Sequence, residues 1–225
     1  MEIRLRLMSN KLPFFHLVRK SNLKNGKSPL ILMIHGYGSN EQDLFSFSRA
    51  IPENFTIISL RGDIEFQYNE YAWYNIFLDY NGVKSYDIEK AKKSRDNILK
   101  SLDICKDLYE IDPDNITLMG FSQGAMLVNA VALTYPEKIN NIISLSGAFD
   151  PYIINLSNSK YLKKLSFYIS HGLNDEILPF DFSKKSLKIL DDNNLNYIFE
   201  EYPIGHTVSP DNFKSMLNWL IEKTN

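Results

Sequence analysis

Ser122 stands between two glycines in the segment GFSQG (120–124), which matches the pattern G-x-S-x-G. This pattern is typical of a sharp turn between a strand and a helix that exposes the serine hydroxyl for nucleophilic attack. The neighbouring sequence fits such a turn, because an apolar run (116–119) precedes the serine and a helical pattern (123–135) follows it. The glycines would let the strand and the helix approach without collisions between Cβ atoms. Ser122 is therefore a candidate nucleophile; the alternative is a tight turn in which the serine is incidental.

A serine hydroxyl is a weak nucleophile, so it needs a histidine as base and a carboxylate that orients this histidine. In proteins with this turn, the acid and then the histidine follow the serine along the chain. His16 and His35 precede Ser122, which leaves His171 and His206 among the four histidines of the sequence.

Asp175 and His206 are the preferred partners for this serine. Asp175 follows His171 by four residues in a loop after a predicted strand, and His206 lies between the last predicted strand and the last predicted helix. Loops of this kind meet at the carboxyl edge of an open α/β sheet. We therefore expect Ser122, Asp175 and His206 to converge there. The alternative pairs Asp150 with His171 and leaves His206 without a role.

Attack on a carbonyl places negative charge on its oxygen, and backbone N–H groups can stabilise this charge. The loop MIHGYGSN (33–40) follows the first buried strand and contains two glycines, so its N–H groups could face that oxygen. A second donor is the backbone N–H of Gln123, directly after the nucleophile. His35, in the same loop, is better interpreted as a residue that braces the loop than as a base.

The elements that must position these residues alternate between short apolar runs and longer amphipathic segments. The predicted strands are LILMIH (30–35), FTIISL (55–60), ITLMG (116–120), IISLS (142–146), LSFYIS (165–170) and YIFEEY (197–202), preceded by an antiparallel pair, EIRLRL (2–7) and FFHLVRK (14–20). Helices are predicted over 87–109 and in the last segment, where Ser209 is the N-cap and Pro210 the first helical residue. Continuous apolar runs are typical of strands buried on both faces of a parallel sheet. We expect an α/β fold with a mostly parallel central sheet and helices on both faces.

The 225 residues are predicted to form one domain, 1–225, because no linker, repeat or low-complexity tract divides them. A net charge of −2 without a basic run argues against a nucleic-acid partner. No segment approaches the roughly 18 apolar residues that cross a bilayer, and the N-terminus lacks the apolar core of a signal peptide. The single cysteine, Cys105, excludes an internal disulfide and fits a reducing compartment. A cytoplasmic location is the expectation.

Four segments carry a resemblance to a known family. HGYGSN (35–40), GFSQGA (120–125), HGLNDEILP (171–179) and GHTVSP (205–210) occur in this order and span nearly the whole chain. With them the chain resembles the α/β-hydrolase superfamily and, more narrowly, its phospholipase/carboxylesterase family, which includes the acyl-protein thioesterases. The resemblance implies an α/β-hydrolase fold with a minimal cap.

The same resemblance implies a role for individual residues. Ser122 corresponds to the nucleophile, Asp175 to the orienting acid and His206 to the general base. The backbone N–H groups of Tyr37 and Gln123 correspond to the oxyanion hole. Members of the family use neither a metal ion nor an organic cofactor. Tyr37 departs from the pattern, since members often carry leucine there, and this departure concerns the substrate more than the chemistry.

The segment 61–86 is the longest stretch available for a cap, and its first part replaces a proline-rich stretch of the family. Its aromatic residues are Phe66, Tyr68, Tyr71, Trp73, Tyr74, Phe77 and Tyr80, together with Tyr86. We expect an apolar groove beside the nucleophile. The side chains expected to contact the substrate in it are Trp73, Tyr74, Ile177 and Leu178. The alternative is that most of the aromatic rings simply cover the sheet.

The expected function is hydrolysis of a carboxylic ester of a small molecule through an acyl-enzyme. Within the same chemistry, an acyl thioesterase or a lysophospholipase is the alternative. From another class, the chain could be a non-catalytic ligand-binding protein on a hydrolase scaffold. The aromatic segment could in addition form the surface of a homodimer.

Overall fold

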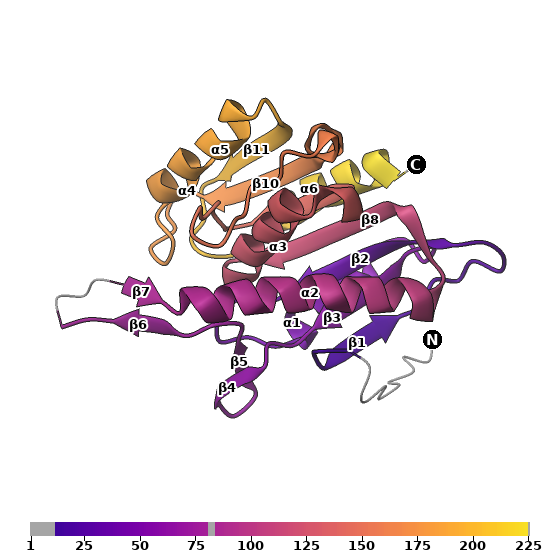
Figure 1. Ribbon diagram of the computed structural model, residues 1–225, viewed down its shortest axis with the longest axis horizontal. Helices are drawn as coiled ribbons and strands as arrows, with labels where there is room; N and C mark the ends of the chain where they lie inside the picture. Colours follow the sequence, from indigo (N-terminus) through magenta and orange to yellow (C-terminus); the bar gives the residue numbers. More distant parts are fainter. Residues whose placement is uncertain (1–11, 81–83, 225) are drawn as a thin grey trace.

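The computed structural model describes residues 12–80 and 84–224, and a central sheet runs through their middle (Figure 1). Seven strands of this part of the chain form the sheet in the order β1-β3-β2-β8-β9-β10-β11. They are β1 (His16–Arg19), β2 (Ser28–Ile34), β3 (Thr56–Leu60), β8 (Ile111–Phe121), β9 (Asn141–Leu145), β10 (Ser166–Gly172) and β11 (Asn196–Tyr202). Every neighbouring pair is parallel except β1 and β3. The mostly parallel sheet predicted from the apolar runs is confirmed.

The antiparallel strand at the start of the sheet pairs with β3. β1 lies within the predicted segment 14–20 and runs against β3, with His16 opposite Leu60. The other segment predicted for an antiparallel pair, 2–7, lies outside the described residues.

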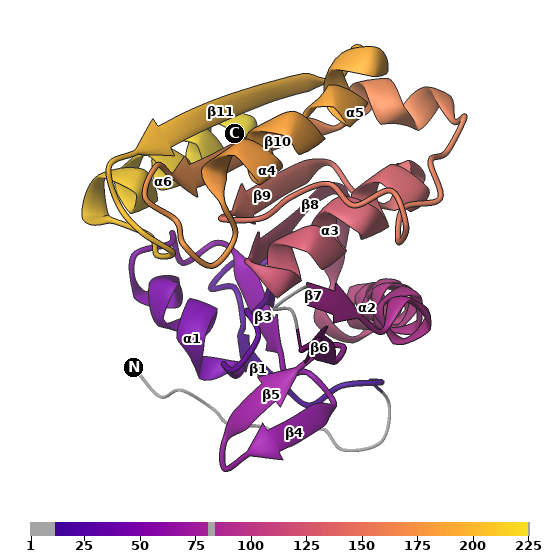
Figure 2. The same ribbon diagram turned by 90° about the vertical axis from the view of Figure 1, so that its left-hand side faces the viewer.

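Helices cover both faces of the sheet (Figure 2). One face carries Leu30 and Leu32 of β2 and packs against α2 (Ile88–Tyr109), α3 (Gln123–Thr134) and α5 (Lys188–Asp192), with α4 (Phe180–Ser186) on the same side. The other face carries Ile31 and Met33 and packs against α1 (Gln42–Phe45) and α6 (Pro210–Thr224). Successive residues of a strand point to opposite faces, so one apolar run supplies both cores. Short 3-10 helices are η1 (Ser46–Arg49), η2 (Pro136–Lys138) and η3 (Lys160–Lys164).

The two helices predicted from amphipathic spacing are confirmed, and so is the cap predicted for the last one. Asp87 accepts the backbone N–H of Lys90 at 2.9 Å at the start of α2. Ser209 Oγ accepts the backbone N–H of Asn212 at 3.2 Å, and Pro210 begins α6. Within the described ranges, no helix combines the length and the apolar character that a membrane span requires.

The described residues of the segment 61–86 form two small antiparallel strand pairs, called hairpins below, which the sequence pattern does not predict. β4 (Ile64–Gln67) pairs with β5 (Glu70–Ala72), and β6 (Ile76–Leu78) pairs with β7 (Lys84–Tyr86). Figure 1 shows that both hairpins project away from the body of the molecule, β6 and β7 at the end where α2 begins. They lie in the segment that the sequence leaves available for a small cap.

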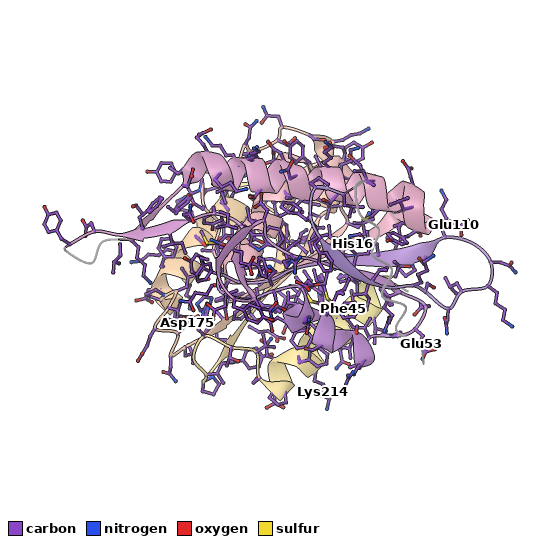
Figure 3. The ribbon with its side chains drawn as sticks, turned by 90° about the horizontal axis from the view of Figure 1, so that it is seen from below. His16, Phe45, Glu53, Glu110, Asp175 and Lys214 are labelled. Carbon is purple, nitrogen blue, oxygen red and sulfur yellow. The ribbon has the colours of Figure 1, made fainter. Side chains whose placement is uncertain are left out.

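The parallel strands place their carboxyl ends at one edge of the sheet, and the loops after β2, β8, β10 and β11 lie there. Figure 3 shows Asp175, from the loop after β10, at the end of the molecule opposite Glu53 and Glu110, which precede β3 and β8. Ser122 directly follows β8 and His206 lies between β11 and α6. The topology therefore brings these loops to the same edge.

Candidate active site

Ser122 occupies a strained turn between β8 and α3. Its φ and ψ angles are 54° and −117°, a conformation that costs a non-glycine residue about 1–3 kcal/mol. The flanking glycines make the turn feasible, because a Cβ at Gly124 would lie 2.5 Å from His35 O and one at Gly120 would lie 2.5 Å from Gly124 C. The Ser122 N–H donates to Leu145 O of β9 at 2.9 Å and fixes the turn on the sheet. The strand–turn–helix context expected for a nucleophile is present.

The structure brings Ser122, His206 and Asp175 together. His206 Nε2 lies 2.8 Å from Ser122 Oγ, and His206 Nδ1 lies 2.6 Å from Asp175 Oδ2. A carboxylate only accepts, so Nδ1 carries the proton and Nε2 is the acceptor for the serine hydroxyl. The ring of Phe121 packs beside the imidazole, with 4.9 Å between centroids. This arrangement can move a proton from the serine to the histidine while the carboxylate holds the ring.

The Asp175 carboxylate is fully buried, and each of its oxygens accepts at least one hydrogen bond. Oδ1 accepts the backbone N–H groups of Ile177 at 3.0 Å and Leu178 at 2.8 Å. Oδ2 faces both His206 and the Nε2 of His171, the latter at 3.2 Å. These donors compensate for the loss of water around a buried charge. The turn 175–178 therefore orients the carboxylate before any substrate binds.

The alternative pairing of Asp150 with His171 is not formed. Asp150 accepts the Tyr86 hydroxyl and the backbone N–H of Tyr152, the latter at 2.9 Å. His171 Nε2 lies 2.8 Å from Leu178 O. Asp150 thus fastens β7 to the loop after β9.

His35 braces the loop after β2, as the sequence predicts. The Gly62 N–H donates to His35 Nε2 at 3.0 Å, so the proton is on Nδ1, which donates to Gly36 O at 2.7 Å. Burial lowers the pKa of His35 to about 4, so the ring is neutral near neutral pH. Since the Gly36 C=O is held by His35, the Tyr37 N–H across the same trans peptide points the opposite way.

The N–H groups of Tyr37 and Gln123 are suited to receive a negatively charged oxygen. The loop passes close to the nucleophile, because a Cβ at Gly36 would lie 3.4 Å from Ser122 Cβ. The Tyr37 N–H makes no hydrogen bond to another residue of the described ranges. Gln123 is the first residue of α3, where an N–H has no carbonyl one turn earlier and the helix dipole is positive.

The Gln123 side chain makes contacts that the sequence does not reveal. The side chain is buried. Its Oε1 accepts the backbone N–H of Trp73 and its Nε2 donates to the backbone C=O of Tyr74, both at 2.9 Å. The indole N–H of Trp73 donates to His35 O at 2.9 Å. The segment 73–74 therefore links α3 to the loop that carries Tyr37. These partners lie as far as 50 positions apart, and no local pattern connects them.

Trp73 and Tyr74 are placed in the core, which contradicts the expectation that they line an open groove. Their exposed fractions are 0% and 2%, whereas Ile177 is 58% exposed and Leu178 is half-buried. For these two rings, the alternative of rings that cover the sheet is the better description. Ile177 and Leu178 follow Asp175 directly and are accessible from solvent.

Two other aromatic rings lie at the surface beside the loop after β2. Tyr37 and Phe66 are 41% and 40% exposed and stack with 4.9 Å between centroids. The hairpin that carries Phe66 is joined to this loop, since the Gly38 N–H donates to Tyr71 O at 3.0 Å and the Tyr71 N–H to Ser39 O at 2.8 Å. The sequence singles out both rings but does not predict their pairing.

Neither a metal site nor a reactive cysteine is found near this site in the described residues. In the described part of the chain, no group of three or more His, Cys, Asp or Glu side chains is arranged to hold a metal ion. Cys105 lies on the buried face of α2, and burial raises the pKa of its thiol to about 12. Cys105 is therefore a neutral packing residue.

The fold, together with Ser122 in the sharp turn between β8 and α3, defines the chain as an α/β-hydrolase. It belongs to the phospholipase/carboxylesterase family, whose model matches residues 20–224.

Individual relatives agree with this family. Acyl-protein thioesterase 1 of Aspergillus fumigatus is 32% identical over 151 residues, which are 60% of this chain and 61% of the relative, less than two thirds of its length. Acyl-protein thioesterase 1 of Emericella nidulans is 27% identical over 217 residues, 84% of this chain and 88% of the relative. The carboxylesterase of Bacillus cereus shares the fold, with a TM-score of 0.80 at 21% identity over 94% of this chain and 95% of that one.

Proposed function

We propose that this protein hydrolyses carboxylic esters or thioesters of small molecules through an acyl-enzyme on Ser122. The observation that supports this most directly is the hydrogen-bonded chain from Ser122 Oγ through His206 to Asp175, with distances of 2.8 and 2.6 Å. The names of its relatives, carboxylesterase and acyl-protein thioesterase, support the class of bond.

In the first half of the reaction, Ser122 Oγ forms a bond to the carbonyl carbon while His206 Nε2 takes the hydroxyl proton. The electron pair of the C=O bond moves to oxygen, and the N–H groups of Tyr37 and Gln123 donate to this oxyanion. When the C=O bond re-forms, the C–O or C–S bond breaks and His206 returns the proton to the leaving alcohol or thiol. Asp175 stays ionised throughout and stabilises the imidazolium.

Water then replaces the leaving group. His206 Nε2 takes a proton from water as its oxygen attacks the acyl carbon, and a second tetrahedral oxyanion forms against the same N–H groups. Collapse breaks the bond to Ser122 Oγ, and His206 protonates the serine. The products are a carboxylic acid and the regenerated hydroxyl, so neither half requires a redox partner.

Replacement of the nucleophile tests the proposal. We expect Ser122→Ala to lower kcat by about 10⁶, the loss found when a triad serine is removed, and to abolish labelling by a fluorophosphonate. Ser46→Ala is a matched control, because Ser46 is exposed and begins the short helix η1 outside the triad, and it should label and turn over like the native protein. Near-native activity in Ser122→Ala would contradict the mechanism. Absence of labelling in the native protein would favour a ligand-binding protein on this scaffold.

The leaving group is a separate question for the same site. The mechanism admits an alcohol or a thiol, since both accept a proton from His206 after the bond breaks. A panel of p-nitrophenyl esters from acetate to palmitate, measured beside acyl-thioesters of the same chain lengths, would rank the two classes by kcat/KM. A preference that follows the acyl chain in both series would assign specificity to the acyl side.

A further inference from the structure

A second histidine contacts the same carboxylate oxygen as His206. His171 lies at the end of β10, and its Nε2 is 3.2 Å from Asp175 Oδ2 and 2.8 Å from Leu178 O. The side chains of His171 and Asp175 are both fully buried. Both neighbours of Nε2 are acceptors, so this nitrogen carries a proton. It donates this proton to Leu178 O, and the Asp175 carboxylate acts on the ring by its nearby charge.

His171 is a neutral donor in a fixed tautomer. Its Nδ1 is buried and has no hydrogen-bond partner among the described residues. The groups that face the ring are Asp175 and Leu178 from its own loop, Phe180 of α4 at 6.1 Å and His206 from the loop before α6. A second proton would place an uncompensated N–H in the interior, and burial lowers the pKa of His171 accordingly.

The contacts of His171 close the turn that carries the acid. Leu178 donates its N–H to Asp175 Oδ1 at 2.8 Å and accepts from His171 through its C=O. The imidazole therefore holds the backbone that orients the carboxylate. On Oδ2, His171 and His206 lie at 3.2 and 2.6 Å.

We propose that His171 is a positioning residue for the hydrolysis: its Nε2–H donates to Leu178 O and holds the turn whose N–H groups orient Asp175, so that Oδ2 faces His206. This inference rests on the proposed function. Among the described residues His171 makes no hydrogen bond to Ser122 and acts through the turn and Asp175. Its removal should therefore slow the proton transfer from Ser122, lower kcat and leave KM unchanged.

Two amide replacements distinguish the effect of the Nε2–H donor from the effect of side-chain size. His171→Gln places an N–H the same number of bonds from Cβ as Nε2, whereas His171→Asn places it one bond short. We expect the Gln variant to stay within about threefold of the native kcat and the Asn variant to lose about 10- to 100-fold in kcat. A loss of this size is usual when a hydrogen-bond partner that orients a metal-binding side chain is removed, and His171 plays the corresponding part for Asp175. Equal activity of both variants, whether native-like or impaired, would overturn the inference.

A double-mutant cycle distinguishes positioning from general support of the fold. In an Asp175→Ala background the carboxylate that the turn orients is absent, so adding His171→Asn should change the residual kcat by less than about twofold. The full 10- to 100-fold loss in that background would overturn the inference. Full activity of Ser122→Ala would instead remove the proposed function itself, so the two failures are distinguishable.

A measurement on the native protein decides the same question if the Asn variant does not fold. In the ¹⁵N NMR spectrum at neutral pH we expect His171 to be protonated on Nε2 alone, with that proton shifted when Asp175 is replaced by alanine. A ring protonated on Nδ1, or an Nε2 proton unaffected by the replacement, would overturn the inference.

Discussion

Gly124 lies where α3 begins, directly against the carbonyl groups of Ile34 and His35, and this contact sets how closely the helix approaches β2. Any side chain there would push the helix away from the strand that leads into the oxyanion loop. The neighbouring Ser122 already holds a positive φ of 54°, so the turn has little capacity for a further shift. At the scale of residues, the geometry of the site therefore depends on the missing Cβ of Gly124 as well as on the reactive side chains.

Gly124→Ala should therefore destabilise the fold by about 3 kcal/mol, the upper range for overpacking, because backbone atoms cannot rotate away. The free energy of unfolding in urea measures this loss. Gly205→Ala is the matched control, since a Cβ there would meet its nearest atom, Asn174 O, at an ordinary 3.6 Å. A stable, fluorophosphonate-reactive Gly124→Ala protein would show that α3 has more freedom than the structure indicates.

At the scale of elements, the segment 73–74 connects three parts of the site. Its backbone is bound by the Gln123 side chain from α3, its indole N–H reaches His35 O in the loop after β2, and Ser94 Oγ of α2 donates to Trp73 O at 2.7 Å. The cap segment is thus anchored in the core by two residues while its hairpins stay at the surface. This anchoring explains why these aromatic rings are buried and do not line a groove.

Trp73→Phe removes the indole N–H and keeps most of the ring. We expect a loss of about 1–3 kcal/mol in unfolding free energy, because His35 O loses a buried donor, and a lower kcat as the oxyanion loop loosens. The preference for acyl-chain length should not change. Trp219→Phe, the other tryptophan, is the control, since it packs in the core around α6. A changed chain-length preference in Trp73→Phe would restore the groove interpretation.

At the scale of the whole molecule, the sequence predicts the sheet and the three converging loops. It does not predict the hairpins or the tertiary contacts that hold these loops in place. Strands such as β2, buried on both faces, leave a continuous apolar run, and α2 and α6 leave a 3.6-residue period. The hairpins in 61–86 have no such signal, because their exposed rings follow no period. The roles of Gln123 and His171 depend on tertiary contacts, which spacing along the chain does not encode.

Buried neutral histidines also give the whole fold a dependence on pH. Burial lowers the pKa of His16, His35 and His171, for His35 to about 4, whereas an unfolded histidine titrates near about 6.5. Between these values the unfolded chain binds more protons than the folded one. The contribution of these histidines to the free energy of unfolding is therefore fully present above about pH 6.5. It is lost as the pH falls towards the pKa of the folded state. For His35 alone, the loss amounts to about 3 kcal/mol by pH 4.

His35→Asn tests this assignment, because an amide at the place of Nδ1 can still donate to Gly36 O but does not titrate. The variant should be less stable at pH 7, since the Gly62 N–H loses its acceptor. Its unfolding free energy, measured in urea from pH 7 to pH 4, should nevertheless fall by about 3 kcal/mol less than that of the native protein. If both proteins lose stability in parallel, His35 does not stay neutral in the folded state, and the orientation of the Tyr37 N–H would need another cause.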